Sequence, residues 1–277
     1  MKYSVTSYSF SQLLRNGEIT QLGMIALAKE IGFDAIEFTN MDPEEGYTDL
    51  EYAVALRKES ERIGLPIISH TIGANLVAEN LEEEIKALKH KIDICELLGA
   101  HLLRHDVMYA YPEGKPQDFD YYVEDLAKVI NEVTEYARSK GIRTCTENHG
   151  YISQDADRVK KLIKTVNNDN FGWLVDIGNF MCTGGDCLES VKIGSKYAFH
   201  VHAKDFNLLA PDTPNGFNTS VGTKLEGTII GQGVVPVKEC IDVIKKTGYD
   251  GYITVEFEGP QPCVNAIKEG LEFLKKC

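Results

Sequence analysis

The stretch that decides the fold is FHVHAKD, residues 199–205. Successive side chains of a strand point to opposite faces, so the apolar residues, beginning with Phe199, are expected on one face and His200, His202 and Lys204 on the other. A single histidine on such a face is more often hydrogen-bonded within a core than a ligand. Carboxylates at the ends of other predicted strands, described below, favour a functional site here.

Strands and helices alternate along the whole chain of 277 residues. This order predicts parallel pairing through right-handed crossovers. Eight such units predict an α/β protein with a single (β/α)8 TIM-barrel domain over residues 1–277. The alternative, an open doubly wound sheet, would need a glycine-rich turn after the first strand, and TSYSF at residues 6–10 has no glycine. The expected strands are 2–10, 34–38, 66–70, 101–105, 142–147, 171–176, 197–204 and 252–256, and the expected helices are 21–31, 50–63, 81–98, 118–140, 155–166, 186–193, 235–246 and 263–276.

Residues 205–232 interrupt this alternation with a connection of about twice the usual length, rich in proline and glycine. Loops of this length in a compact domain are either functional or disordered. Because this one follows the strand that carries His202, we expect it to cover a substrate.

Composition narrows the classes of partner. The formal net charge of −13 disfavours binding to nucleic acid or to an anionic membrane, although it leaves room for a local basic pocket. No run of about eighteen apolar residues occurs, and the N-terminal strand lacks the apolar segment of a signal peptide. The sequence therefore predicts a cytoplasmic protein.

The seven cysteines are scattered and form no C-x-x-C pair, so neither a zinc ribbon nor a thioredoxin-type site is indicated. We expect reduced thiols. The one disulfide that spacing would permit joins Cys182 and Cys187.

Acidic residues and one histidine stand at the ends of the last four predicted strands: Glu147, Asp176, His202 and Glu256. The C-terminal ends of parallel barrel strands meet at one rim, so these four side chains are expected to converge. Three carboxylates and one imidazole form a typical ligand set for a divalent metal. The alternative is four independent rim residues that make local hydrogen bonds.

With these residues in place, the chain resembles the xylose isomerase-like TIM-barrel superfamily. This group includes sugar-phosphate isomerases and epimerases, ketose 3-epimerases, inosose dehydratases and the endonuclease IV group. Each matching motif is short, but together they follow the family's order through the second half of the barrel: TCTENHG (144–150), LVDIGN (174–179), FHVHAKD (199–205), GQG (231–233) and TVE (254–256).

The resemblance implies one divalent metal ion held by Glu147, Asp176, His202 and Glu256. Oxygen-rich ligation favours Mn²⁺ or Mg²⁺, with Zn²⁺, Co²⁺ and Fe²⁺ as alternatives. It also implies that Glu147 and Glu256 are catalytic, because in the family's ketose epimerases the two glutamates act as acid and base on opposite faces of the substrate. A metal-stabilised enediolate would then link proton removal next to a carbonyl to proton return, giving epimerisation or isomerisation.

Four further residues are predicted to bind substrate: His70, His105, His149 and Lys204. The first two end predicted strands and resemble histidines that bind additional zinc ions in the endonuclease group. Hydrogen-bonded rim histidines are the alternative interpretation of that pair. For Lys204 the alternative is a salt bridge to a neighbouring carboxylate.

Two departures from the family pattern bear on function. Asn179 stands where the endonucleases have a zinc-binding histidine and many ketose epimerases have a substrate-contacting one. The loop after the seventh strand contains no Asp-x-His pair for a third zinc. Both argue against a trinuclear nuclease, and the first weakens the match to a ketose 3-epimerase.

The leading hypothesis is a metal-dependent isomerase or epimerase of carbohydrate metabolism that acts on a small sugar, sugar phosphate or polyol. The alternatives are an inosose or keto-sugar dehydratase that uses the same site, an endonuclease IV-type phosphodiesterase, and a non-catalytic sugar-binding protein. Which sugar is used stays open, as does assembly into a homodimer or homotetramer.

Overall fold

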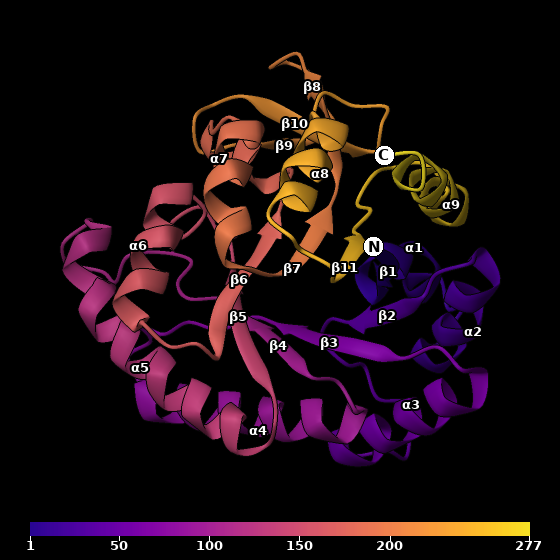
Figure 1. The fold of residues 1–277 in the computed structure, drawn as a ribbon, viewed down its shortest axis with the longest axis horizontal. Helices are drawn as coiled ribbons and strands as arrows, with labels where there is room; N and C mark the ends of the chain where they lie inside the picture. Colours follow the sequence, from indigo (N-terminus) through magenta and orange to yellow (C-terminus); the bar gives the residue numbers. More distant parts are fainter.

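Eight parallel strands close into a barrel in the computed structural model, which describes residues 1–277 (Figure 1). Their order around the barrel is β1-β11-β7-β6-β5-β4-β3-β2, so each strand lies beside its neighbour in the chain and β11 closes the ring against β1. The (β/α)8 prediction is confirmed. The barrel strands are β1 (Lys2–Thr6), β2 (Ala35–Phe38), β3 (Ile67–Ile72), β4 (Leu102–His105), β5 (Arg143–Glu147), β6 (Phe171–Asp176), β7 (Ala198–Ala203) and β11 (Tyr252–Val255).

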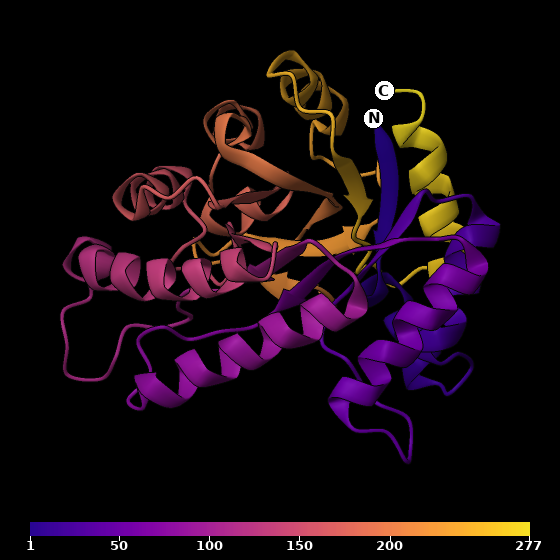
Figure 2. The ribbon, with the colours of Figure 1, turned by 60° about the horizontal axis from the view of Figure 1, so that its bottom comes forward.

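The helices surround the strands, and the two chain ends lie near each other (Figure 2). The first predicted strand is too long, because after Thr6 the chain turns into the 3-10 helix Ser7–Phe10 and the short helix α1. Two other 3-10 helices, Asn179–Thr183 and Ser195–Tyr197, flank α7. The α-helices are α1 (Ser11–Arg15), α2 (Gln21–Ile31), α3 (Asp49–Ile63), α4 (Leu81–Leu98), α5 (Phe119–Ser139), α6 (Ala156–Val166), α7 (Cys187–Gly194), α8 (Val237–Lys246) and α9 (Cys263–Leu274).

Local sequence signals set the helix ends. The Thr48 side chain accepts the backbone N–H of Glu51, and the Glu51 carboxylate accepts the N–H of Thr48, so α3 begins with a capping box. Gly32 ends α2 with a φ of 103°, in the left-handed region that glycine adopts without a Cβ clash. These signals explain why the predicted helix bounds lie within two residues of the observed ones, as in α2 and α3.

Apolar side chains fill the start of the barrel interior. Leu102, Cys145 and Leu174 form a small buried cluster there, and Phe199 packs against it. The prediction that Phe199 shares a face with the outward apolar residues of its strand is wrong, because the β6–β7 register shifts at Trp173 and the bulge turns Phe199 inward. Because this apolar cluster fills the N-terminal end of the barrel interior, the polar inward-facing residues lie at the C-terminal ends of the strands.

The long connection after β7 is not a structureless loop. It folds into a three-stranded antiparallel sheet in the order β8-β10-β9, visible beside the barrel in Figure 1. Its strands are β8 (Asp205–Leu209), β9 (Phe217–Asn218) and β10 (Lys224–Thr228). The sheet is tied to neighbouring loops, since the hydroxyl of Tyr151 donates to the carbonyl of Asn218 over 3.3 Å.

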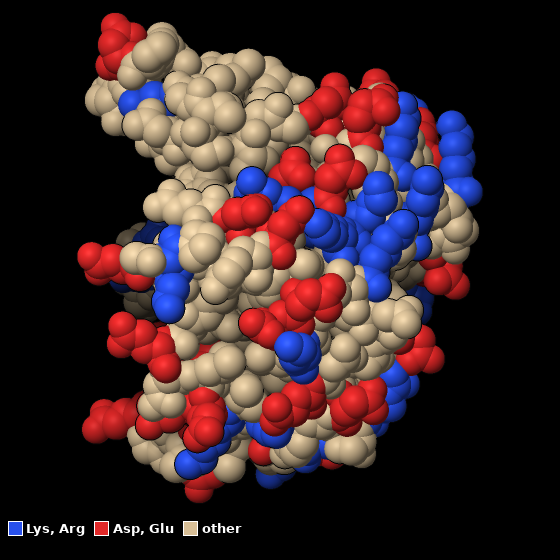
Figure 3. Space-filling model, turned by 90° about the vertical axis from the view of Figure 1, so that its left-hand side faces the viewer, with Lys and Arg blue, Asp and Glu red and all other residues tan.

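Charged side chains of both signs alternate over the side that carries α5 and α6 (Figure 3). Some are paired, as where Lys161 Nζ lies 2.6 Å from a carboxylate oxygen of Asp120. All seven cysteines are free thiols, as expected, so Cys182 and Cys187 form no disulfide. None of the helices is both long and apolar enough to cross a membrane.

Candidate active site

The four predicted ligand residues converge at the C-terminal mouth of the barrel. Glu147 and Asp176 are the last residues of β5 and β6, His202 lies on β7, and Glu256 directly follows β11. One oxygen or nitrogen atom of each side chain lies within 4.8 Å of those of the other three. The first three side chains are buried, and Glu256 is 12% exposed. The convergence expected from strand ends is therefore present.

Asp176 is fixed in position by the backbone around it. Its Oδ1 accepts the N–H groups of Gly178 and Asn179 over 2.9 and 2.8 Å. The side chain of Asn148 accepts the N–H of Asp176 over 3.0 Å and also the indole N–H of Trp173 over 3.0 Å. The other oxygen, Oδ2, accepts no hydrogen bond although it is buried. Its charged neighbour is Nζ of Lys204, 3.3 Å away, so this oxygen already faces a cation.

The electrostatic environment of the four ligand residues favours a bound cation. Burial, together with repulsion from Glu147 and Glu256, outweighs the attraction of Lys204 and raises the pKa of Asp176 to about 7. Three closely spaced carboxylates with one imidazole match the ligand preferences of a divalent metal. Glu147, Asp176, His202 and Glu256 therefore fit a divalent metal ion.

Lys204 carries positive charge into the same cluster. Its Nζ lies 2.5 Å from Oε2 of Glu256, 3.3 Å from Oδ2 of Asp176 and 3.4 Å from Oε1 of Glu258. Burial alone would lower the pKa of Lys204, but these carboxylates hold it well above its usual value. The salt bridge considered for Lys204 is present, and the same side chain lines the cavity described below.

Arg104, which the sequence interpretation missed, binds the glutamate on the other side of the cluster. Its guanidinium lies 2.8 Å from Oε2 of Glu147 and 2.8 Å from Oδ1 of Asp106. The second oxygen of Glu147 accepts the amide N–H of Asn179 over 2.8 Å. Asn179, noted above as a departure from the family pattern, thus contacts Glu147. No local signal in the sequence marks Arg104, because its inward direction depends on the pairing of β4 with β3 and β5.

A cavity of about 340 Å³ opens above this cluster. Its lining is mostly polar, with both signs of charge represented. A second cavity of about 230 Å³ adjoins it through His149, Lys204 and Glu258, and Phe217 of the small sheet forms part of its wall. The larger cavity is lined by Tyr8, Thr39, Asn40, Thr71, Ile72, Gly73, Arg104, Asp106, Tyr109, Glu147, His149, Lys204, Glu256 and Glu258.

His149 faces both cavities and is oriented by an aspartate. Its Nδ1 lies 2.8 Å from Oδ1 of Asp106, and the other oxygen of Asp106 accepts the hydroxyl of Tyr109 over 2.6 Å. Burial would lower the pKa of His149, but the hydrogen bond to Asp106 and the negative charge of Asp106 raise it. The imidazole can therefore hold a proton that it presents to the cavity through Nε2.

The two remaining predicted substrate contacts do not line the cavity. His70 pairs in register with Phe38 and Leu103, which belong to the apolar core between strands and helices, and its Nδ1 lies 3.1 Å from the carbonyl oxygen of Phe38. His105 stacks on the Phe171 ring and is also fully buried. The cavity-facing residues of β3 and β4 are instead Thr71 and Arg104.

Backbone N–H groups of the GQG stretch (231–233) donate to the side chain of Asp205. Asp205 accepts the backbone N–H groups of Gly231 and Gly233 over 2.9 Å each, that of Val235 over 3.0 Å and that of Phe206 over 2.9 Å. These donors are the ones that a phosphate would need. Because Asp205 already accepts these hydrogen bonds, the donors are not open to a phosphate, and the residues anchor the loop instead.

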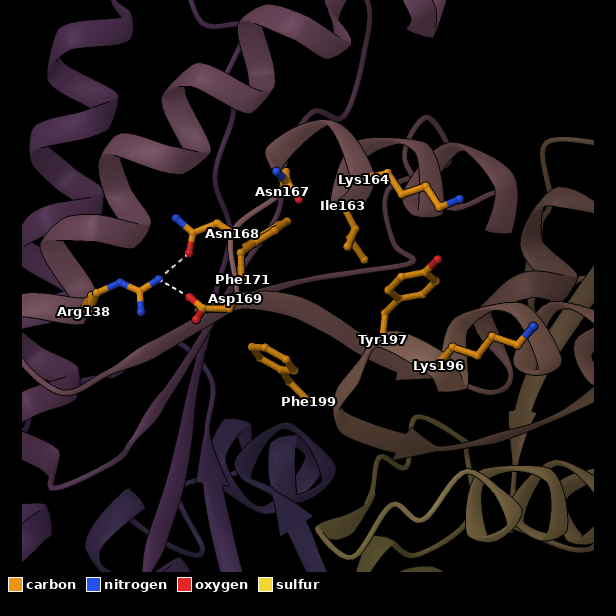
Figure 4. Close-up of a pocket in the computed structure, with 10 residues that line it drawn as sticks. All are labelled: Arg138, Ile163, Lys164, Asn167, Asn168, Asp169, Phe171, Lys196, Tyr197 and Phe199. Carbon is orange, nitrogen blue, oxygen red and sulfur yellow. Dashed lines mark hydrogen bonds and ion pairs between the residues drawn. The ribbon is translucent and has the colours of Figure 1, made fainter.

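A larger hollow lies away from this site, at the starts of β6 and β7 (Figure 4). Its volume is about 660 Å³, and its one strong polar arrangement is the hydrogen bonding of Arg138 to Asn168 and Asp169. It contains no convergent carboxylates or histidines, so it lacks the ligands found at the other end of the barrel.

Comparison with known proteins identifies the family. The sequence profile described as "Xylose isomerase-like TIM barrel" matches residues 25–277. The chain belongs to this family. An inosose dehydratase of Clostridium perfringens is 24% identical over 260 residues, which cover 88% of this chain and 84% of that protein.

Solved structures of this family share the fold along the full chain. The IOLI protein with a bound zinc atom has a TM-score of 0.78 and 18% identity, with coverage of 100% of this chain and 97% of that one. A D-psicose 3-epimerase solved in the presence of D-fructose has a TM-score of 0.75 and 15% identity, with coverage of 100% and 99%. At these identities the likeness shows the fold alone.

Proposed function

We propose that this protein is a divalent-metal-dependent isomerase or epimerase that moves a proton next to the carbonyl of a sugar or a related polyol. The observation that carries the proposal is the placement of Glu147 and Glu256. They come from the two outer strands, β5 and β11, of the four strands that supply ligand residues. Glu147 is paired with Arg104 and Glu256 with Lys204, and both glutamates line the same cavity.

Glu147, Asp176, His202 and Glu256 would hold the ion, with Mn²⁺ or Mg²⁺ expected from the oxygen-rich ligand set. A bound divalent ion polarises the substrate carbonyl and so acidifies the neighbouring C–H.

The two glutamates would transfer the proton. Arg104 and Asn179 orient Glu147, while Lys204 orients Glu256 and lowers the pKa of that carboxylate together with His202, despite burial. One carboxylate removes the proton from carbon, and the other returns a proton from its own side of the substrate. Return to the opposite face gives an epimer, and return to the neighbouring carbon gives an isomer.

A dehydratase is the second candidate, and the Asp106–His149 pair favours it. Loss of a hydroxyl group next to the enediolate requires an acid that protonates the leaving oxygen. The protonated imidazole of His149, held by Asp106 and open to the cavity, could serve as this acid. The resemblance of the chain to inosose dehydratases over 88% of its length also supports this candidate.

The nuclease alternative loses its main support. It depended on His70 and His105 as ligands for additional ions, yet both lie outside the cavity lining and face the core around the barrel.

Isotope exchange tests the proposal. The protein, loaded with Mn²⁺, is incubated in D2O with a panel of ketoses and inososes, and products are analysed by mass spectrometry and NMR. Solvent deuterium on carbon in a product that is otherwise an isomer of the substrate supports an isomerase or epimerase, whereas a product that has lost one water indicates the dehydratase.

The variants Glu147→Gln and Glu256→Gln should each abolish deuterium incorporation, because an amide cannot accept the proton. Glu272→Gln, on the exposed face of α9, is the matched control and should retain activity. Full exchange in either active-site variant would refute the acid and base assignment.

A further inference from the structure

A further buried carboxylate, outside the ligand set, contacts His202. Glu37, on β2, is fully buried and reaches two histidines of β7. Its Oε1 lies 2.9 Å from Nε2 of His202, and its Oε2 lies 3.0 Å from Nε2 of His200. Sequence analysis attached no role to Glu37, and the proposed reaction does not use it.

This arrangement defines which ring nitrogen of His202 carries a proton. Both oxygens of Glu37 face ring nitrogens of histidines, and a carboxylate can only accept hydrogen bonds. Nε2 of His202 must therefore be the N–H donor. The other nitrogen, Nδ1, lies 3.6 Å from Oε2 of Glu256, on the side of the ligand set.

The second oxygen of Glu37 faces His200, which belongs to a chain of hydrogen-bonded side chains that crosses the barrel. Nε2 of His200 also lies 2.8 Å from the hydroxyl of Thr254, which lies 2.6 Å from the hydroxyl of Ser4. All of these residues are at most 3% exposed. Because solvent does not reach this layer, no water replaces Glu37 as the acceptor for His202.

We propose that Glu37 is a positioning residue that fixes the Nε2–H tautomer and the ring orientation of His202, so that Nδ1 is presented as the metal ligand. The inference rests on the proposed metal site but not on the reaction catalysed there. Partners of this kind typically account for a 10- to 100-fold effect on metal affinity.

A competing arrangement would use the same three side chains as ligands. Glu37, His200 and His202 also lie close enough to one another to hold an ion of their own. In that case His202 would have no proton on Nε2, and the protein would bind two ions per chain.

The test measures metal binding and tautomer without any substrate. In zinc-loaded protein with ¹⁵N-labelled histidine, His202, assigned by comparison with His202→Gln, should show a protonated Nε2 and a metal-bound Nδ1. Because this measurement uses the unmodified chain, it does not depend on the folding of a variant. A protonated Nδ1, a wild-type chain that binds no zinc, or two zinc ions per chain, would overturn the proposal.

The variant Glu37→Gln should weaken Zn²⁺ binding 10- to 100-fold in a chelator-competition titration, because its amide can accept from only one of the two histidines. Thr254→Val, which leaves the contact between Glu37 and His202 in place, is the matched control and should change affinity much less. Equal affinity in Glu37→Gln and wild type would refute the role of Glu37. If zinc binding depends on Glu37 but no deuterium exchange occurs with any substrate, the proposed function fails while this inference stands.

Discussion

The buried charge of Asp176 should make the metal-free protein less stable as pH rises. The pKa of Asp176 is raised from 3.8 to about 7, mainly by burial. Between these values the native protein keeps a proton that the unfolded chain releases, so the free energy of unfolding falls with increasing pH and stays low above pH 7. Asn at this position is neutral at every pH and avoids this loss.

The size of the effect follows from the interval of titration. Each pH unit corresponds to about 1.4 kcal/mol, so the 1.5 units or so between pH 5.5 and the pKa give about 2 kcal/mol. We therefore expect the stability of Asp176→Asn relative to wild type to increase by about 2 kcal/mol between pH 5.5 and pH 8. Both values lie above the isoelectric point, near 5.0.

Urea unfolding in the presence of EDTA measures this difference, with Trp173 as the reporter. It is the single tryptophan of the chain and is fully buried beside the site. Titrating groups that lie away from Asp176 are common to both proteins and cancel in the comparison. Asp120→Asn, which removes an exposed carboxylate paired with Lys161, should show no such pH-dependent gain. A stability difference between Asp176→Asn and wild type that is the same at both pH values would refute the reasoning.

Two further predictions concern stability. Asp205→Ala should lower the free energy of unfolding by about 2–3 kcal/mol, because it leaves four backbone donors without their acceptor, whereas Asp205→Asn keeps one oxygen and should lose less. Equal losses in the two variants would contradict the contribution of the oxygen that asparagine retains. Gly172→Ala should cost about 1–3 kcal/mol, because its Cβ would lie 2.3 Å from the Phe199 ring. The double variant with Phe199→Ala should remove most of this coupling, and a strictly additive double variant would exclude the clash.

Much of the fold could be predicted because its signals are local. Helix ends such as Gly32 and Gly64 are marked by residues that favour left-handed backbone, and eight strand-helix units imply a closed barrel. The four ligand residues could be placed because each combines a position near the C-terminal end of its strand with the inward side of the alternation. His105 also ends its strand but lies on the outward side.

Residues inside strands were harder to place because their direction depends on register. The third strand extends to Ile72, two residues beyond its predicted end, so His70 lies within it and faces outward. Arg104 and Glu37 look ordinary in sequence, and only pairing with the neighbouring strands shows that they face inward. The bulge that turns Phe199 inward follows from a register shift that no local pattern announces.

The anchoring of the small sheet by Asp205 has a consequence for protein engineering. The carboxylate joins the two ends of this insertion, residues 205–206 and 231–235, to each other just after the strand that bears His202. Residues 210–223, between β8 and β10, take no part in these hydrogen bonds. A combinatorial library confined to residues 210–223 would vary the wall that Phe217 contributes to the smaller cavity. The four ligand residues of the barrel would keep their positions.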